Sequence, residues 1–271
     1  MIKRSTRKYL SMILDYFIAR IPISIASILE WRIQKALGKG IGFGSVVHEV
    51  RTLREFLVKL HIREPTVLDV GANIGQYALE FIKQYPSVQI HSFEPGTEAF
   101  LELSRQSQSF PDWTVYKFGF GHSISNMSLY SDNPGSASSS LISKNIFFDH
   151  GPPQQRQEVS IRTIDDFIQK EMHVIPDVIK LDVEGFEFAC LNGAEKYIDE
   201  VKIVQFEFGQ ANIESRVFFR DFWIFFSAKN FEIYRITAKS PIHVREYNET
   251  LETFAVTNYL ALNCRFSTTM Y

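Results

Sequence analysis

The sequence predicts an α/β fold in which a mainly parallel sheet carries helices on both faces. Strand and helix signals alternate along most of the chain beyond residue 45, as expected for successive strand–helix–strand units. The first strong strand also ends in an acid followed by closely spaced glycines, in VLDVGANIG at 67–75, which is typical of the ligand-binding edge of such a sheet. With 271 residues and 45% hydrophobic content, the chain can bury a large core.

Residues 1–45 are predicted to form an amphipathic helical extension, and residues 46–271 the main domain. Asp15 and Arg20 interrupt the apolar run of the extension, which therefore falls short of the roughly 18 apolar residues of a membrane span. We expect its helix to pack on the main domain. The alternatives are a peripheral membrane contact, favoured by basic residues at the start, or a contact with a second copy. The apolar stripe consists of Leu10, Ile13, Leu14, Phe17, Ile18 and Ile21, and the basic residues are Lys3, Arg4, Arg7 and Lys8.

The elements of the main domain follow in order. The first half contains a helix over 47–60, a strand over 65–70, a helix over 75–85 that ends before Pro86, a strand over 88–93, a helix over 97–108 and a strand over 114–119. The second half contains a strand over 177–183, a helix over 187–198, a strand over 202–208, a helix over 214–229, and strands over 231–236 and 253–262.

Between these halves, residues 122–163 interrupt the alternation. They are rich in Ser, Gly, Asn and Pro, and they predict loops around short strands at 126–130 and 158–164. We interpret them as a loop or hairpin insertion, because the alternation resumes immediately afterwards. Thr163 is expected to cap the helix that follows.

Composition excludes several classes of protein. The net charge of −2, with basic residues scattered outside the N-terminus, gives no field that would hold nucleic acid. Two isolated cysteines, Cys190 and Cys264, form no disulfide framework and fit a reducing compartment, so a cytoplasmic location is expected, with membrane association as the alternative. The seven histidines offer no closely spaced pair of ligands, which disfavours zinc. The sequence does not indicate an oligomeric state.

The turn after the first strand indicates the type of ligand. Asp69, Gly71, Asn73 and Gly75 form a DxGxNxG pattern, whose glycines allow a ligand to approach the backbone and whose following helix presents free N–H groups. This pattern differs from the GxGxxG of pyrophosphate binding. An acid beside the turn would repel a diphosphate but would suit a ligand that carries an ammonium group.

The end of the second strand supplies a second acid. Glu94, in HSFEP, lies nineteen residues beyond Gly75, where an acidic residue accepts the hydroxyls of a ribose in dinucleotide sites. A ribose, a positively charged head and no diphosphate together describe S-adenosylmethionine. At the end of the third strand, Gly119 and Phe120 are candidates for contact with the adenine ring, although Phe120 also suits a core position.

A second group of charged residues lies further along the chain. In VIKLDVEGFE, Lys180, Asp182 and Glu184 alternate with apolar residues, which puts three charges on one side of a central strand. Unpaired burial of such groups is costly, so they either pair with one another or lie at the open end of the strand. Glu207, in VQFEFG, ends the next strand and is expected in a neighbouring position.

Six motifs, taken in order, resemble the FkbM family of S-adenosylmethionine-dependent methyltransferases: VLDVGANIGQY, SFEP, ASSSL, RTIDDF, IKLDVEGFEFACLNGA and VQFEFG, over roughly residues 50–262. The resemblance implies a class I methyltransferase fold, with a seven-stranded Rossmann-like sheet whose last strand is antiparallel. It also implies methyl transfer, usually to an oxygen of a sugar, glycan or natural product. Matching motifs make Asp69, Gly71, Asn73 and Gly75 the methionine-side loop, Glu94 the ribose acid, and Lys180, Asp182, Glu184 and Glu207 the catalytic group. The family usually has a small and an aliphatic residue where this chain has Gly119 and Phe120, which weakens the assignment of the adenine contact.

Chemistry suggests roles within the catalytic group. We expect Asp182 or Glu184 to be the general base, Lys180 to orient them or to stabilise a developing alkoxide, and Glu207 to position the acceptor. The alternative is a structural network of ion pairs beneath the site. A divalent cation held by the carboxylates is possible but not favoured.

Two further functions stay open from the sequence, a nicotinamide-dependent oxidoreductase and a non-catalytic cofactor-binding module. The chain lacks GxGxxG after the first strand, which counts against the oxidoreductase. The segments VIKLDVEG and VQFEFG are intact, which counts against a module that has lost catalysis. His122, His150 and the serines 138–140 are minor candidates for contact with the acceptor, with surface or loop roles as the alternative.

Overall fold

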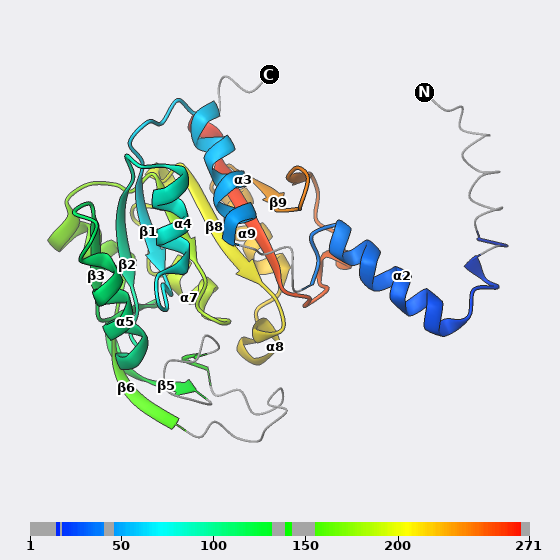
Figure 1. Ribbon diagram of the computed structural model, residues 1–271, viewed down its shortest axis with the longest axis horizontal. Coiled ribbons are helices and arrows are strands. Elements are labelled where there is room, and N and C mark those ends of the chain that lie inside the picture. The colour runs from blue at the N-terminus through cyan, green and yellow to red at the C-terminus, as the bar shows by residue number, and fades with distance from the viewer. Residues whose placement is uncertain (1–14, 17, 41–45, 132–138, 143–154, 267–271) are drawn as a thin grey trace.

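The computed structural model describes residues 15–16, 18–40, 46–131, 139–142 and 155–266. Within them, a central sheet runs in the order β10-β9-β11-β8-β7-β1-β2-β3 (Figure 1). The strands are β1 (Thr66–Val70), β2 (Gln89–Phe93), β3 (Trp113–Tyr116), β7 (Val178–Leu181), β8 (Ile203–Phe208), β9 (Phe231–Arg235), β10 (Ile242–Val244) and β11 (Thr257–Asn263).

The order of the strands confirms the α/β class and corrects the strand count. Strands β3, β2, β1, β7 and β8 pair in parallel, and β11 runs antiparallel between β8 and β9. These seven strands give the expected sheet with one antiparallel member. The eighth strand, β10, pairs with β9 through Ile242 and Val244. The sequence analysis missed it because three residues are too short to show an alternating pattern.

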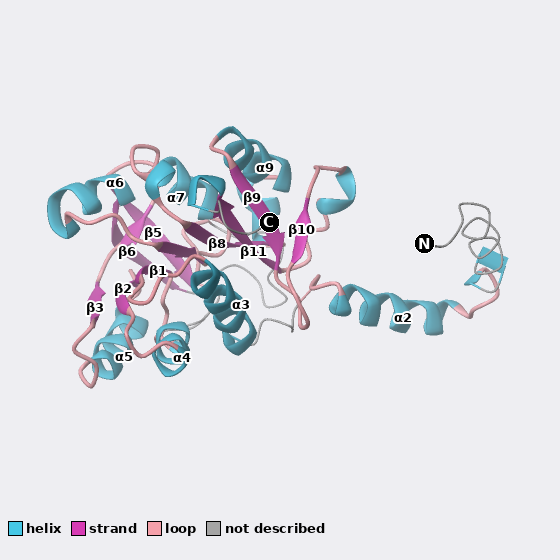
Figure 2. Ribbon diagram, turned by 90° about the horizontal axis from the view of Figure 1, so that it is seen from above, coloured by secondary structure: helices cyan, strands magenta, loops and turns pink. Residues whose placement is uncertain are grey.

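Helices cover both faces of this sheet, as Figure 2 shows. One face carries α3 (Val46–Lys59), α4 (Gln76–Gln84) and α5 (Thr97–Ser107), and the other carries α6 (Ile164–Phe167), α7 (Glu187–Asn192) and α9 (Phe219–Ala228). Each face has its own apolar core, and Val67 packs in one while the next residue, Leu68, packs in the other. A strand buried on both faces is apolar at nearly every position, and this explains why VLDV precedes the glycines.

Two expected helices are shorter than predicted. The helix predicted over 187–198 ends at Asn192, with Gly193 as its C-cap, and a short helix η2 (Ile198–Glu200) follows. A side chain at Gly193 would come within 2.1 Å of the backbone oxygen of Gly121. The helix predicted over 214–229 is divided into α8 (Ala211–Ser215) and α9 by Arg216, whose φ of 56° is left-handed.

The predicted insertion contains a small sheet of its own. Strand β6 (Gln155–Arg162) pairs in parallel with β4 (Gly119–Phe120) and antiparallel with β5 (Ser125–Ser131). The Thr163 hydroxyl accepts a hydrogen bond from Asp166 N at 3.0 Å, so the predicted cap of α6 is confirmed. Four short helical segments complete the described fold: η1 (Ile168–Met172), η2, η3 (Glu249–Leu251) and η4 (Cys264–Phe266).

The N-terminal extension is described only in part. The predicted stripe over 10–21 lies mostly outside the described residues, whereas α2 (Ile23–Ala36) is described and projects away from the sheet and its helices (Figure 1). None of the helices in the described part of the chain combines the length and apolar character needed to cross a membrane. Gly38, two residues after the end of α2, is buried against Ile236 of the main domain.

Candidate active site

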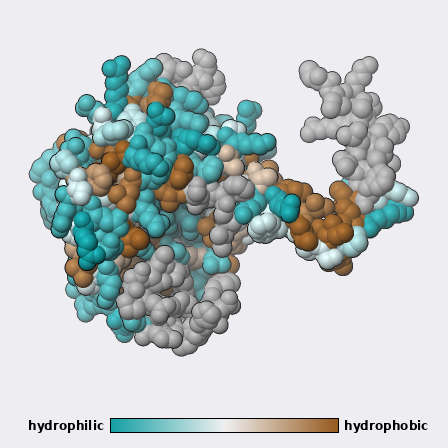
Figure 3. Space-filling model, viewed as in Figure 1, coloured by the Kyte–Doolittle hydropathy of each residue, from teal (hydrophilic) through white to brown (hydrophobic). Residues whose placement is uncertain are grey.

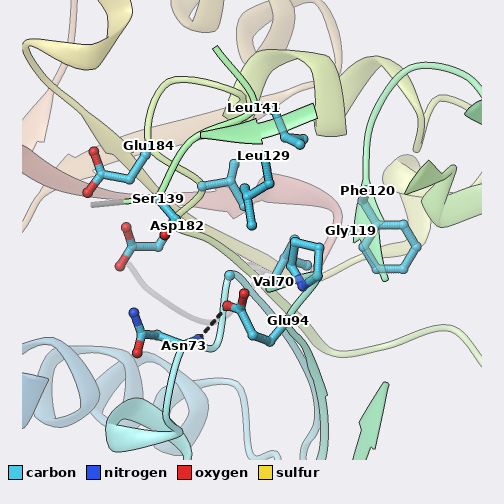
Figure 4. A pocket seen from close by; sticks show the side chains of 13 residues that line it. Val70, Asn73, Glu94, Gly119, Phe120, Leu129, Ser139, Leu141, Asp182 and Glu184 are labelled. Atoms are coloured by element: carbon cyan, nitrogen blue, oxygen red, sulfur yellow. Dashed lines mark hydrogen bonds between the residues drawn. The ribbon is translucent and has the colours of Figure 1, made fainter. Parts of the chain in front are cut away.

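The carboxyl ends of β1, β2, β7 and β8 meet at one edge of the sheet and line two adjoining cavities. The first cavity, of about 50 Å³, lies between the turn after β1, Glu94 and the insertion (Figure 4). The second, of about 420 Å³, lies between the same turn, α4 and Glu207. Gly71, Asn73, Asp182 and Glu184 line both, so the two cavities adjoin.

The turn after β1 has the backbone geometry that its glycines imply. Gly71 and Gly75 have φ values of 78° and 90°, and Asn73 has a φ of 47°. Asparagine tolerates this left-handed conformation, and the Asn73 side chain accepts a hydrogen bond from Ile74 N at 2.7 Å. A Cβ atom at Gly71 would lie 1.8 Å from the backbone oxygen of Asp182. Gly71 therefore lets the ends of β1 and β7 approach each other.

Glu94 lies at the junction of this turn with β2. Its carboxylate accepts hydrogen bonds from Asn73 N at 2.9 Å and from Gly96 N at 2.7 Å, the first of which is drawn in Figure 4. A carboxylate has about four acceptor positions, so about two are left for a ligand. Burial raises the pKa of Glu94 to about 7, although both backbone N–H groups act in the opposite direction.

Asp69 is placed differently from the other residues of its motif. It is fully buried and lines neither cavity. Its carboxylate accepts a hydrogen bond from the Ser92 hydroxyl at 3.2 Å and pairs with Lys180 Nζ at 3.2 Å. Direct contact of Asp69 with a ligand stays a prediction, and the observed contacts make it a support for Lys180.

Lys180 links the two predicted groups of residues. Its Nζ lies 3.2 Å from Asp69, 3.4 Å from Asp182 and 4.9 Å from the centre of the Tyr77 ring. Burial alone lowers the pKa of Lys180, but the carboxylates of Asp69, Asp182 and Glu49 outweigh it and raise the pKa above the ordinary value. Lys180 therefore stays charged and holds the Asp182 carboxylate beside the cavities.

Asp182 and Glu184 lie beyond the end of β7, which corrects the expectation that they share one side of a strand. β7 ends at Leu181, and Glu184 has a left-handed φ of 54°. The buried Glu187 holds this turn, because its carboxylate accepts from Val183 N at 2.9 Å and from Gly185 N at 3.1 Å. Asp182 and Glu184 consequently both line the first cavity, as Figure 4 shows.

Glu207 lies at the end of β8, beside β7 as expected, and lines the second cavity. Its pKa lies well above the ordinary value, first because of burial and then because of the nearby carboxylates of Asp182 and Glu187. A carboxyl group that keeps its proton can donate a hydrogen bond to an oxygen atom of a ligand.

Gly119 and Phe120 line the first cavity, but the Phe120 ring belongs to the core. Its side chain is almost completely buried, with its ring centre 4.6 Å from that of Phe93 and 5.4 Å from that of Phe118. Both residues form β4 of the small sheet and do not continue β3. An adenine contact at this point stays a prediction.

Of the minor candidates, the structure brings the serines of the insertion to the site. Ser139 lines the first cavity, and the Ser140 hydroxyl donates to the backbone oxygen of Glu184 at 2.8 Å. Ser138 and His150 lie outside the described residues, and His122 is exposed away from both cavities. Within the described ranges, no three His, Cys, Asp or Glu side chains are grouped closely enough to hold a metal ion.

The structure also reveals a residue that the sequence analysis missed. Glu49 of α3 is buried next to the site, and its carboxylate accepts from the side-chain amides of Gln205 at 2.7 Å and Asn258 at 3.1 Å. The Gln205 side chain in turn accepts from the Tyr77 hydroxyl at 2.9 Å. Burial, followed by the nearby Asp182, raises the pKa of Glu49 to about 7. The sequence contained one signal for this residue: Glu49 lies one helical turn before Leu53, so an acid occupies the apolar side of the helix.

Replacing Glu49 by alanine is expected to destabilise the protein. Glu49→Ala leaves the buried amide of Gln205 and the half-buried amide of Asn258 without an acceptor, at about 1–3 kcal/mol for the buried group and less for the other, which corresponds to a Tm lower by roughly 4 °C. Glu55→Ala, on the exposed side of the same helix, is the matched control and should change the Tm little. Thermal unfolding followed by circular dichroism measures both, and equal Tm values for the two variants would contradict the role of Glu49.

The buried carboxyl groups also predict how stability depends on pH. Glu49, Glu94 and Glu187 have a pKa of about 7, compared with an ordinary value of 4.5, and that of Glu207 is raised too. The folded state therefore binds these protons more tightly than the unfolded state does. The resulting stabilisation is complete below pH 4.5 and is lost as the pH rises through 7.

We expect the Tm of the ligand-free protein to be roughly 5 °C higher at pH 6 than at pH 8. His91 opposes this effect, because burial lowers its pKa and its protonation at lower pH therefore destabilises the folded state, but it contributes only one proton. Melting curves in matched buffers at constant ionic strength provide the measurement. A Tm that instead rises from pH 6 to pH 8 would contradict the prediction, because it would mean that the folded state does not bind these protons more tightly than the unfolded state.

Comparisons with known proteins add three findings. The family model described as "Methyltransferase FkbM domain" matches residues 69–233. Two curated proteins are similar: Methyltransferase 1 of Beauveria bassiana (strain ARSEF 2860), 24% identical over 144 residues, and Methyltransferase sdnD of Sordaria araneosa, 23% identical over 161 residues. These matches cover 48% and 49% of this chain, but only 58% and 61% of the two relatives. The crystal structure of Methyltransferase FkbM from Methylobacillus flagellatus KT aligns with 73% of this chain and 44% of its own, at 18% identity and a TM-score of 0.44.

Proposed function

Because the chain belongs to the FkbM methyltransferase family, we propose that it transfers a methyl group from S-adenosylmethionine to a hydroxyl oxygen of a sugar, glycan or natural product. The observation that carries the proposal is the cleft itself, in which a carboxylate suited to a ribose adjoins a pair formed by a lysine and a carboxylate. Family membership confirms the resemblance that the motifs indicated.

The residues present fit S-adenosylmethionine in three respects. Glu94 has acceptor positions left for the ribose hydroxyls. The turn after β1 borders both cavities through Gly71 and Asn73, so its backbone is within reach of a ligand there. The first cavity is too narrow for a whole nucleoside with an amino acid attached, so such a ligand would extend into the second cavity, next to Asp182 and Glu184.

S-adenosylmethionine supplies an electrophilic methyl group on sulfur. In methyl transfer a new O–CH₃ bond would form as the S–CH₃ bond breaks, S-adenosylhomocysteine would be the leaving group, and the hydroxyl proton of the acceptor would pass to a carboxylate. Asp182 is the first candidate for this base, because it lines both cavities and Lys180 fixes its position, and Glu184 is the second. Glu207 would position the acceptor by donating a hydrogen bond from its retained proton. Holding the acceptor in line within a dry cleft would supply most of the acceleration.

Thermal shift measurements test the choice of cofactor. The protein is heated with S-adenosylhomocysteine, with NAD or with neither, and we expect only S-adenosylhomocysteine to raise the Tm. Because Glu94 accepts ribose hydroxyls best when it is ionised, the shift should be larger at pH 8 than at pH 6. A shift with NAD alone would favour the oxidoreductase, and no shift with either would refute the proposal.

Transfer of a radiolabelled methyl group tests the acceptor class. The protein is incubated with labelled S-adenosylmethionine and an extract of the source organism, with and without EDTA, and the products are fractionated. We expect label in glycans or small molecules, and EDTA should not prevent it. Label found only in protein or nucleic acid would overturn the proposed acceptor class. A cofactor-dependent Tm shift without any transfer would favour the non-catalytic binding module.

A further inference from the structure

Helix α2 carries large apolar side chains that the described part of the domain does not cover. None of its fourteen residues is buried. Figure 3 shows its apolar surface in brown, apart from the body of the protein. The exposed fractions range from 42% to 86% for Ile23, Ile25, Ile28, Leu29, Trp31 and Ile33. A contiguous apolar surface of this kind on a projecting helix indicates a binding surface.

The distribution of charge along the chain indicates what this surface binds. The first 40 residues contain eight Lys or Arg and two Asp or Glu, a formal charge of +6, so the remaining residues carry −8 of the total of −2. A surface of anionic lipid would therefore attract the N-terminal segment and repel the rest of the chain. This complementarity favours a lipid bilayer as the partner.

The side chains on and around α2 are of the types found at membrane interfaces. Lys35 Nζ lies 4.5 Å from the centre of the Trp31 ring, and the Arg20 guanidinium lies 3.5 Å from that of Tyr16. Tryptophan, tyrosine and long cations all combine an apolar part with a polar end, which suits the boundary between lipid headgroups and acyl chains. Within an apolar contact between two proteins, the same cations would lose their hydration.

The geometry of α2 fits a helix that lies in the surface of a bilayer. Ser27, Glu30 and Gln34 recur at i, i+3 and i+7 on one face, whereas Ile25, Leu29 and Ile33 recur at i, i+4 and i+8 on another. At about 1.5 Å per residue the helix is roughly 21 Å long, which is shorter than the roughly 30 Å hydrocarbon core. The segment that follows α2 is attached to the domain, since Gly38 is buried and Lys39 Nζ donates to the backbone oxygen of Thr250 at 3.3 Å.

We propose that α2 binds the surface of an anionic lipid bilayer, with Ile25, Ile28, Leu29 and Ile33 inserted among the acyl chains and the nearby cations in the headgroup layer. This binding is independent of the chemistry at the cleft. It anchors the domain through the short attached segment after α2.

Vesicle flotation with the full chain tests the proposal. The vesicles consist of phosphatidylcholine alone or of phosphatidylcholine with about 30% phosphatidylglycerol. We expect binding to the anionic vesicles, and weaker binding when the salt concentration is raised to 0.5 M. Equal binding to both types of vesicle, or binding to neither, would overturn the proposal.

Two double variants separate insertion from charge. Ile25→Glu with Ile28→Glu puts two acids on the apolar side of α2, and Ser24→Glu with Ser27→Glu adds the same charge at the same spacing on the more polar side. Both weaken the electrostatic attraction equally, but only the first prevents insertion. We therefore expect its partition coefficient to be at least tenfold lower than that of the serine variant, and equal coefficients would refute insertion.

Folding and self-association are checked with the same variants. Since no residue of α2 is buried, all variants should keep the Tm of the unmodified protein. Light scattering without lipid gives the oligomeric state. A stable dimer that only the isoleucine variant dissociates would show that a second copy covers α2, and this outcome would overturn the membrane assignment.

Discussion

Asp182→Asn is expected to lower the rate of methyl transfer by about 10²–10⁴-fold while leaving the binding of S-adenosylhomocysteine within about threefold. The asparagine keeps the size of the side chain but cannot take up the proton of the acceptor hydroxyl. Asp182 lines both cavities, and its carboxylate lies 3.4 Å from Lys180 Nζ. Because asparagine has the same size as aspartate, this substitution should disturb the shape of the site least. The rate is measured as labelled methyl incorporated into the acceptor fraction, and binding is measured as a shift in Tm.

The chain offers a closely matched control for this substitution. Asp199 also lies 3.4 Å from a lysine Nζ, that of Lys229, and its side chain is 50% exposed, compared with 40% for Asp182. Asp199→Asn removes the same charge far from the cleft and should leave the rate unchanged. If Asp182→Asn retains most of the activity while Glu184→Gln does not, the base is Glu184. If both retain it, the carboxylates do not act as the base.

Gly71→Ala is expected to abolish binding of the cofactor and to lower the stability of the protein by at least about 3 kcal/mol. Its Cβ would lie 1.8 Å from the backbone oxygen of Asp182, and backbone cannot move aside as a side chain can. The left-handed φ of 78° adds about 1–2 kcal/mol of strain for a residue with a side chain. The ends of β1 and β7 would separate, and with them the turn after β1 and the position of Asp182.

Two other glycines with left-handed φ separate strain from steric conflict. Gly75→Ala, at a φ of 90°, would place its Cβ 2.7 Å from the Trp113 side chain, and Gly40→Ala, at a φ of 82°, would meet nothing within 4 Å. We expect the loss of stability to decrease in the order Gly71, Gly75, Gly40, with Gly40→Ala still binding S-adenosylhomocysteine. Chemical denaturation gives the free energies of unfolding. A loss at Gly40 as large as that at Gly71 would mean that backbone strain alone explains both.

Much of the site could be predicted because it depends on where strands end. Parallel strands bring their carboxyl ends to one edge of a sheet, so the residues after VLDV, HSF, VIKL and IVQF were bound to lie near one another. The positions of Glu94, Asp182 and Glu207 follow from this rule. The glycines of the DxGxNxG pattern separately indicated a turn after this strand, and the structure adds that Gly71 and Asn73 have left-handed φ values there, which these residue types tolerate better than others.

Other features depend on contacts between distant segments, and the sequence does not encode them locally. Glu49 and Asn258 are 209 residues apart and meet only because α3 packs beside β8 and β11. Asp69 was expected to contact the bound cofactor. Instead its carboxylate pairs with Lys180, which lies on β7, the strand next to β1. Whether a buried acid faces a cavity or a neighbouring cation is set by the side chains that surround it.

By itself, the sequence determined the α/β class, the family, the edge of the sheet that carries the site and the identity of most residues there. The class and the edge follow from periodicity and strand order, which are local or topological properties of the chain, whereas the family follows from the resemblance of the six motifs. Only the tertiary structure decided which carboxylates reach the cleft, which are held by Lys180 or by backbone N–H groups, and that α2 lies uncovered. The reason is physical: the pairing and ionisation of a buried charge depend on all the groups within a few ångströms, and folding brings those groups from separate parts of the chain.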